Sequence, residues 1–218
     1  MKSRQEIKAL AREALRAQRG TAILLFFLFM VLAGFVGAIG GVFAVFVPVL
    51  GSLISLALSI CIMVMAVNSY GEYIKIYRGE EACVSGLFAG FKVNFLRKLG
   101  GMWWMALWVM LWSLLFVIPG MIKALAYFAT PFILADCPNV KARDALKLSM
   151  RMTHGHKGKL FVMMLSFIGW GILASLTLGI LGIVFVFPYM YLTYAGFYTE
   201  LRDQAIANGT IAPAEFGM

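Results

Sequence analysis

The most prominent feature of the chain is a set of three long stretches almost free of charge. Residues 21–71 and 160–199 contain no Asp, Glu, Lys or Arg, and residues 99–135 contain one such residue, Lys123. A helix needs about 20 apolar residues to cross a bilayer. Each stretch can supply two crossings, those in the middle stretch being short. The pattern therefore predicts an all-α polytopic membrane protein with six transmembrane helices in three hairpins.

Short uncharged turns connect the two helices of each predicted hairpin. We expect residues 21–39 to pair with 49–70, residues 100–118 with 121–135, and residues 160–177 with 183–199. Tyrosines in the returning helices are expected at the membrane surface, where such side chains are enriched. Proline removes a backbone donor and breaks or bends a helix. We expect such breaks at Pro48, Pro119, Pro131 and Pro188.

Basic amphipathic segments precede the apolar stretches. In residues 3–19, which open with a Ser3–Glu6 capping box, apolar side chains recur at helical spacing on one face. The other face carries Lys8, Arg12, Arg16 and Arg19. A basic amphipathic helix beside a span typically lies in the membrane interface. Docking against a partner remains the alternative. Residues 80–98 and 142–153 contain similar helices.

Lys and Arg concentrate in residues 1–20, 72–98 and 137–159, each next to an apolar stretch. Positive residues favour the cytoplasmic side of a membrane. The distribution places these segments and both chain ends in the cytoplasm. It also explains the net charge of +9 without a nucleic-acid partner, for which no sequence motif is present.

The three hairpins with their basic helices indicate one membrane domain over residues 1–203. They also suggest an internal repeat with units 3–79, 80–137 and 138–203, although shared topology alone would produce the same pattern. Residues 204–218 are expected to form a short, loosely ordered tail.

Composition agrees with a membrane protein, with 62% hydrophobic and 13% charged residues and a mean hydropathy of +0.88. The three cysteines form no C-x-x-C pair, and no known catalytic motif is present. His154 and His156 are the only histidines, too few to form a metal site by themselves. We expect no catalytic residues, metal or cofactor.

Cationic side chains are the best candidates for a binding site. Lys123 is the one charge within an apolar stretch, and such residues are functional candidates by default. Its proximity to the turn at residues 118–120 also allows it to snorkel to the outer headgroups. The third basic segment offers further contacts to lipid phosphate or another anionic ligand. These candidates are Arg143, Lys147, Arg151, His154, His156 and Lys157.

Residues 118–127 (IPGMIKALAY), residues 142–153 (ARDALKLSMRMT) with the glycines that follow, and the N-terminal MKSR helix carry a resemblance. They are similar to an uncharacterised bacterial membrane protein family, domain of unknown function 975. That resemblance implies a multi-pass protein of the bacterial cytoplasmic membrane and brings no established catalytic residues. The serine–threonine–glycine pattern after the third amphipathic helix is also loosely similar to the membrane portion of some glycerophosphodiester phosphodiesterases.

Three functional hypotheses follow from these features. The leading one is a non-enzymatic scaffold or assembly protein that organises anionic lipid or partner proteins, as a homo-oligomer in one version. A transporter, channel or lipid-translocating protein is the alternative, and a cavity lined by Asn68, Ser113, Lys123 or Thr130 would support it. An intramembrane enzyme acting on lipid is the third, and would need Asp136, Asp144, His154 and His156 to share one cleft.

Overall fold

The computed structural model describes residues 2–217, in which the chain is helical and contains no strand. The helices are α1 Arg4–Ala17, α2 Arg19–Phe46, α3 Pro48–Arg78, α4 Gly86–Lys92, α5 Phe95–Leu115, α6 Val117–Ala126, α7 Thr130–Asp136, α8 Ala142–Thr153, α9 Lys157–Leu165, α10 Ile168–Leu176 and α11 Phe187–Ala207. A π-helical segment, η1, spans Gly182–Val186, and a 3₁₀ turn, η2, spans Pro213–Phe216.

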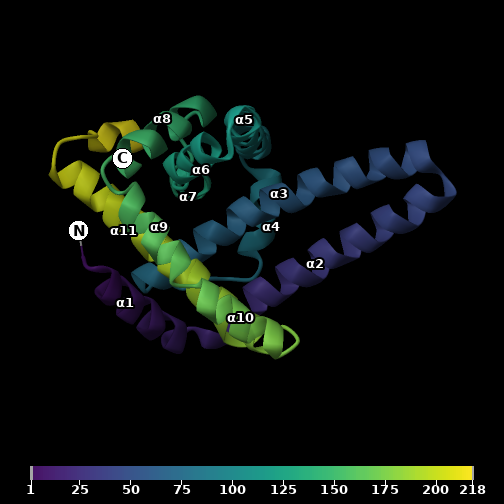
Figure 1. Cartoon of the computed structure of the whole chain (residues 1–218), viewed down its shortest axis with the longest axis horizontal. Coiled ribbons are helices and arrows are strands. Elements are labelled where there is room, and N and C mark those ends of the chain that lie inside the picture. The colour runs from purple at the N-terminus through teal and green to yellow at the C-terminus, as the bar shows by residue number, and fades with distance from the viewer. Residues whose placement is uncertain (1, 218) are drawn as a thin grey trace.

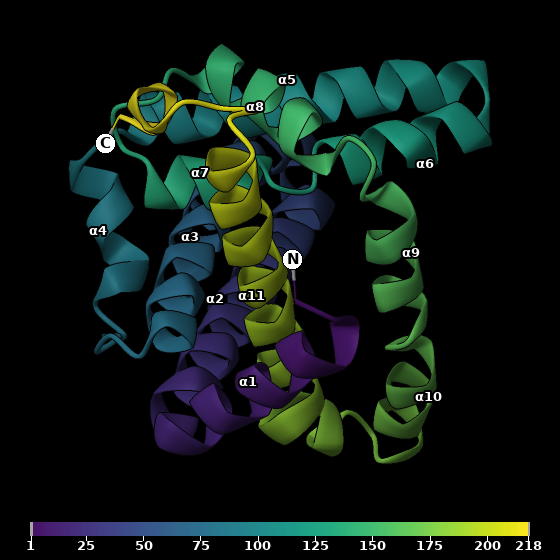
Figure 2. The ribbon, with the colours of Figure 1, turned by 90° about the vertical axis from the view of Figure 1, so that its left-hand side faces the viewer.

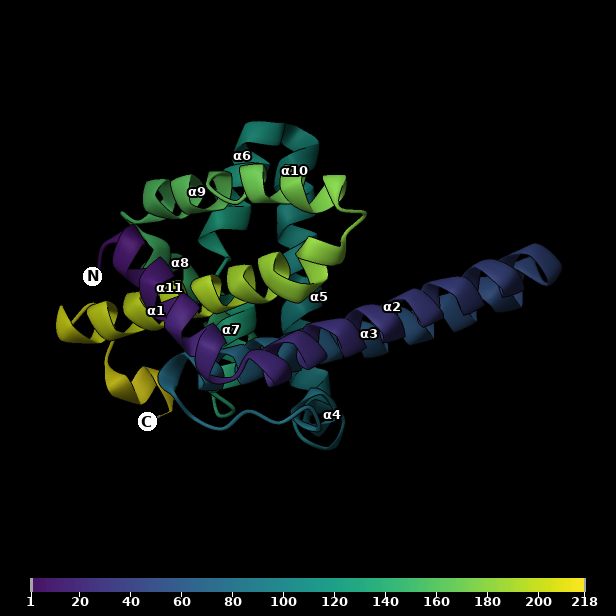
Figure 3. The same ribbon diagram turned by 90° about the horizontal axis from the view of Figure 1, so that it is seen from below.

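Three helical hairpins extend from a shared base (Figure 1). They are α2–α3, α5–α6, and a third in which the chain returns from α9–α10 through η1–α11, with α10 contacting η1. Figures 2 and 3 show that the tips of these hairpins point in clearly different directions. Figures 1 and 3 place both chain ends at the end of the molecule opposite the α2–α3 tip.

Five helical segments are long and apolar enough to cross a membrane. They are Arg19–Phe43, Val49–Arg78, Phe95–Leu115, Val117–Asp136 and Lys157–Leu176. The sixth predicted span is not among them. Residues 180–207 are helical without a break, the π-helical turns of η1 passing directly into α11, and α11 continues into the charged residues Glu200, Arg202 and Asp203.

The base holds the hydrophobic core, where the returning helices α3, α7 and α11 meet. Tyr73 and Tyr198 are almost fully buried there, and the Tyr198 ring stacks on Phe132 at 5.4 Å between centroids. The Tyr73 hydroxyl donates to the Ala22 carbonyl at 3.1 Å. These tyrosines are core residues, contrary to the expected place at the membrane surface. A buried partner for a tyrosine hydroxyl makes such burial favourable.

Helix α1 packs on the protein itself. The capping box is present, with Ser3 Oγ accepting from the Glu6 amide and Glu6 accepting from the Ser3 amide. The apolar face of the helix, formed by Ile7, Ala11 and Leu15, is buried against α11, α3 and α2. That face is therefore not available to lipid, unlike the apolar face of an interfacial helix.

Three of the four predicted proline breaks fall in the first turn of a helix. Pro48 is the first residue of α3, Pro131 is the second residue of α7, and Pro119 is the third residue of α6. Pro188 instead lies inside the unbroken helical residues 180–207, directly after the π-helical turns of η1, and a π-bulge is a usual accompaniment of an interrupted helix. A first-turn amide has no partner within the helix, so proline is tolerated there. The second hairpin therefore turns at Phe116, which is extended, and not at residues 118–120.

Helix α8 stabilises the break between α6 and α7. The Ser149 hydroxyl donates to the Ala126 carbonyl at 2.8 Å and accepts from the Ala129 amide at 3.1 Å. The Thr153 hydroxyl also reaches the Ala126 carbonyl. Backbone groups freed where one helix ends and the next begins are costly when buried, and these two side chains satisfy them.

The segment after residue 203 is ordered, contrary to the expected loose tail. Helix α11 continues to Ala207, and the chain then folds back towards α8. Ile211 and Phe216 are almost fully buried and anchor this C-terminal segment. Two apolar anchors provide the burial that a free tail lacks.

Candidate functional site

A cluster of charged side chains lies where the three returning helices end. Asp136 at the end of α7 accepts two hydrogen bonds from the Arg78 guanidinium, at 2.7 and 2.8 Å. Arg202 of α11 donates to the same carboxylate at 2.7 Å, and the Tyr198 hydroxyl donates to it at 3.0 Å. The Asp136 side chain is only 11% exposed. Paired, hydrogen-bonded charges of this kind are the form in which burial is tolerated.

The returning helices α3, α7 and α11 each contribute one charged residue to this cluster. Arg78, Asp136 and Arg202 each stand one position before the last residue of the proposed repeat units. The ion cluster thus joins α3, α7 and α11. The sequence predicts that this end of the helices faces the cytoplasm. Because both carboxylate oxygens are occupied, Asp136 serves to hold the helices and is not a free acid or base.

A second polar group of residues lies on α3, α4 and α5 next to the ion cluster. Asn68 donates to the Leu87 carbonyl at 2.7 Å and accepts from the Lys98 ammonium. Glu72 pairs with Lys75 at 2.7 Å and accepts from the Cys83 amide. These side chains border a cavity of about 260 Å³. Lys75 pairs with Glu72 and Arg78 with Asp136, whereas Lys98 donates to the Asn68 amide oxygen and forms no ion pair within the described residues.

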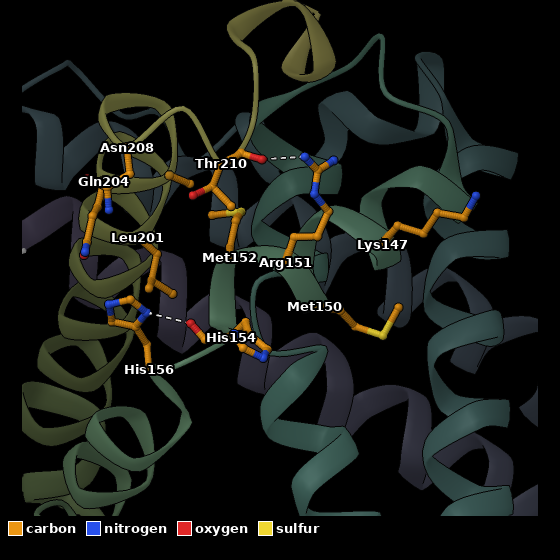
Figure 4. A pocket seen from close by; sticks show the side chains of 11 residues that line it. Lys147, Met150, Arg151, Met152, His154, His156, Leu201, Gln204, Asn208 and Thr210 are labelled. Atoms are coloured by element: carbon orange, nitrogen blue, oxygen red, sulfur yellow. Dashed lines mark hydrogen bonds between the residues drawn. The ribbon is translucent and has the colours of Figure 1, made fainter.

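A cavity of about 660 Å³ lies between α8 and the end of α11. It brings together four predicted candidates, Lys147, Arg151, His154 and His156 (Figure 4). Arg151 is already occupied, because it donates to both oxygens of Glu215 and to the Thr210 carbonyl. In Figure 4 its guanidinium reaches towards Thr210 and away from the histidines.

Hydrogen bonds from Arg151 lower the pKa of Glu215. A hydrogen bond to the charged form of a carboxylate favours that form. Glu215 therefore neutralises the charge of Arg151 in this cavity. The ion pair holds the C-terminal segment against α8. The two histidines are connected only by a contact of 3.0 Å between His156 Nδ1 and the His154 carbonyl. No group of three or more His, Cys, Asp or Glu suited to a metal ion occurs within the described residues.

A third cavity, about 440 Å³, separates the α5–α6 hairpin from α8. Lys123, Arg143 and Lys147 line it together with Trp104, Trp108, Trp112 and Tyr127. The Lys123 ammonium is 5.1 Å from the centre of the Trp112 ring, and the Arg143 guanidinium is 5.2 Å from that of Trp104. The three tryptophans recur every four residues and so share one face of α5. The structure thus places Lys123 beside α8.

The basic face of α1 forms a separate region. Lys8 donates to Ser166 at 2.6 Å and lies over the Phe167 ring, while Arg12 lies over the Tyr189 ring. Partial burial lowers the pKa of Lys8, and nearby Arg4 and Arg12 add to the effect. Arg12, Arg16 and Arg19 border a cavity of about 410 Å³ with Trp170 and Phe185. Lys157, the first residue of α9, borders none of these cavities.

The four residues that an intramembrane enzyme would need in one cleft do not share one within the described residues. Asp136 lies in the ion cluster, Asp144 is exposed beside Lys147, and the histidines line the α8–α11 cavity. Of the four transport candidates, Asn68 and Lys123 each border a cavity, and the two cavities are different ones. Thr130 is fully buried. Ser113 packs against Gly120, where any larger residue would collide with it.

Sequence reasoning did not identify Arg78, Arg202 and Tyr198 as site residues. A signal was present, because Arg78 and Arg202 occupy the same place in their units as Asp136. A basic–acidic–basic set at equivalent positions indicates a shared ion pair only if the three helix ends converge. That convergence became evident from the fold.

Comparison with known proteins identifies a family. Neither a curated protein nor a solved structure matches the chain. One family, described as "Protein of unknown function (DUF975)", matches residues 1–124 and 102–205. The two matches overlap and together cover almost the whole chain, as the resemblance in the sequence predicts. The chain therefore belongs to the DUF975 family of proteins of unknown function.

Proposed function

We propose that this protein is a six-span protein of the bacterial cytoplasmic membrane, with the base and both chain ends in the cytoplasm. Five segments support this topology by their length and composition, and we assign the sixth span to η1 with the first part of α11. Crossing one bilayer requires the hairpin tips, which point in different directions in Figures 2 and 3, to turn to the same side. The basic segments all belong to the base, as expected for the cytoplasmic side.

Within that membrane, its function is to act as a non-enzymatic scaffold that assembles with copies of itself and organises lipid or partner proteins. One observation carries this proposal: the predicted spans are largely bare. In four of the five segments, no more than 22% of the most apolar 18-residue stretch is buried within the protein. Hydrophobic side chains at the hairpin tips, such as Phe46 at 79% and Leu178 at 94%, are exposed as well.

Bare spans favour a scaffold over transport by a single copy. A transporter encloses its pathway between packed spans, with broken helices lining a central site. Here the packed core lies in the base, and the cavities border α8, α1 and α3. The exposed apolar faces are surfaces on which lipid or other spans can pack, as membrane helices do through close contacts.

The mass of the detergent-solubilised protein, measured by native mass spectrometry with lipid retained, tests this function. A defined oligomer with bound lipid is the expected result. The same preparation in liposomes should show no solute flux and should change lipid order. A monomer that leaves lipid order unchanged contradicts the scaffold, and flux that depends on the protein would establish the transport alternative.

A further inference from the structure

We propose that the cleft between the α5–α6 hairpin and α8 binds the phosphate headgroup of an anionic phospholipid. This inference rests on the proposed membrane location and gives the scaffold a specific lipid contact. The cleft has a volume of about 440 Å³. Cations from two elements line it, with Lys123 on α6 and Arg143 and Lys147 on α8.

The cleft has positive charge that the protein leaves largely uncompensated. None of its lining residues is acidic. Within residues 2–217, Lys123 and Arg143 form no ion pair, and Lys147 has only a long contact of 3.8 Å with the exposed Asp144. Arg151 in the neighbouring cavity, by contrast, is neutralised by Glu215. The α5–α6–α8 cleft is therefore the better place for an external anion.

The position of Lys123 makes an anionic partner favourable. It lies in the apolar segment Val117–Asp136, where an ionisable side chain is unfavourable without a partner. Its ammonium is near the Trp112 and Tyr127 rings, at 5.1 and 5.9 Å from their centres. Aromatic faces attract a cation but do not neutralise it. A phosphate oxygen would supply the missing charge and accept hydrogen bonds from Arg143.

The walls of the cleft indicate a lipid and not a soluble anion. Trp104 and Trp108 line it and are each 37% exposed, beside the exposed Leu107 and Leu111 on the same helix. These residues form a continuous apolar surface along α5, on which an acyl chain can lie. Tryptophan is also favoured where an apolar chain meets a polar headgroup.

Native mass spectrometry of the full-length protein with phosphatidylglycerol or phosphatidylcholine tests the site. We expect selective retention of phosphatidylglycerol, and a fall of about tenfold in its apparent affinity in a Lys123→Gln, Arg143→Gln double variant, as for loss of charged hydrogen bonds. Lys141→Gln removes the same charge from the exposed start of α8 and should leave retention unchanged. When Lys123→Gln is combined with Arg143→Lys in place of Arg143→Gln, part of the phosphatidylglycerol retention should return.

A second readout uses the tryptophans of the cleft. Phosphatidylglycerol with brominated acyl chains should quench the fluorescence of the wild type more than that of the double variant. Equal retention by wild type and double variant, with circular dichroism showing both folded, overturns the proposal. So does displacement of the lipid by excess inorganic phosphate, which would make the site one for a soluble anion. The oligomer mass, read from the same spectra, tests the scaffold separately.

Discussion

At the scale of residues, the carboxylate of Asp136 connects the three returning helices. It receives Arg78 from α3 and Arg202 from α11, while Tyr198 occupies a further acceptor position. Arg97 also holds the end of α7. Its guanidinium donates to the Leu134, Cys137 and Val140 carbonyls there. The end of α7 is thus fixed through both side chain and backbone.

Replacing Asp136 with Asn should destabilise the fold strongly. Two guanidinium groups, 23% and 17% exposed, would lose their counterion, and breaking a buried pair on one side costs about 3 kcal/mol or more. Reversible unfolding in mixed detergent micelles measures the change in the free energy of unfolding. Asp144→Asn is the control, because its contact with Lys147 is exposed and worth about 0.5 kcal/mol at most. Equal effects of the two variants would refute a holding role for Asp136.

The C-terminal segment should detach from α8 at acidic pH. The hydrogen bonds from Arg151 lower the pKa of Glu215. The ion pair therefore stabilises the docked C-terminal segment fully above the ordinary glutamate pKa of about 4.3. This stabilisation is lost as the pH falls through the lowered pKa of Glu215. Hydrogen exchange at the Ile211 amide, which donates to the Ala205 carbonyl, should speed up relative to its intrinsic rate in that window. Glu215→Gln should exchange faster at neutral pH and lose the pH response.

At the scale of elements, the pattern of polar and apolar residues predicted the helices well but not their surroundings. The Ser3–Glu6 box and the left-handed Gly79 mark helix ends that depend on local sequence. Whether an apolar face meets lipid or protein depends on distant segments. Residues 3–19 have the sequence of an interfacial helix, yet the apolar face is covered by α11, α3 and α2.

Shortening an apolar side chain of α1 tests whether its apolar face contacts protein or lipid. Leu15→Ala should lower the free energy of unfolding by about 2–4 kcal/mol, because Leu15 is 3% exposed and the truncation leaves a cavity in the base. Gln5→Ala, on the exposed side of α1, should change little. Unfolding in detergent with both variants in parallel provides the comparison. A Leu15→Ala protein as stable as the wild type would mean that α1 lies in lipid and not on the base.

The positions of the prolines show another limit of local sequence. Pro119 and Pro131 were expected to break helices, and a break does precede Pro131, between α6 and α7. Sequence did not reveal that Ser149 and Thr153 of α8 satisfy the backbone at this break. That interaction joins positions more than 20 residues apart, so only the packed structure brings the partners together.

At the scale of the whole molecule, the candidate binding site could be predicted in part. The structure brings Lys123, Arg143 and Lys147 to one cleft and ties Arg151 into the C-terminal segment. The sequence identified these cations but could not separate the paired from the unpaired ones. That distinction depends on the positions of Glu215 and of the α5 tryptophans in the folded protein. The arrangement of bare hairpins on a packed base likewise arises from contacts among α1, α3, α7, α8 and α11.

Every functional proposal made for this protein depends on its membrane topology. Cysteine accessibility in oriented membrane vesicles tests that topology most directly. After replacement of the native Cys61, Cys83 and Cys137, single cysteines at Leu178, in the third hairpin tip, and at Asp144, on the base, would be exposed to a membrane-impermeant maleimide. Hairpins that cross the membrane predict labelling of Leu178→Cys from the outer side only and of Asp144→Cys from the cytoplasmic side only. Labelling of both positions from the same side would contradict the account.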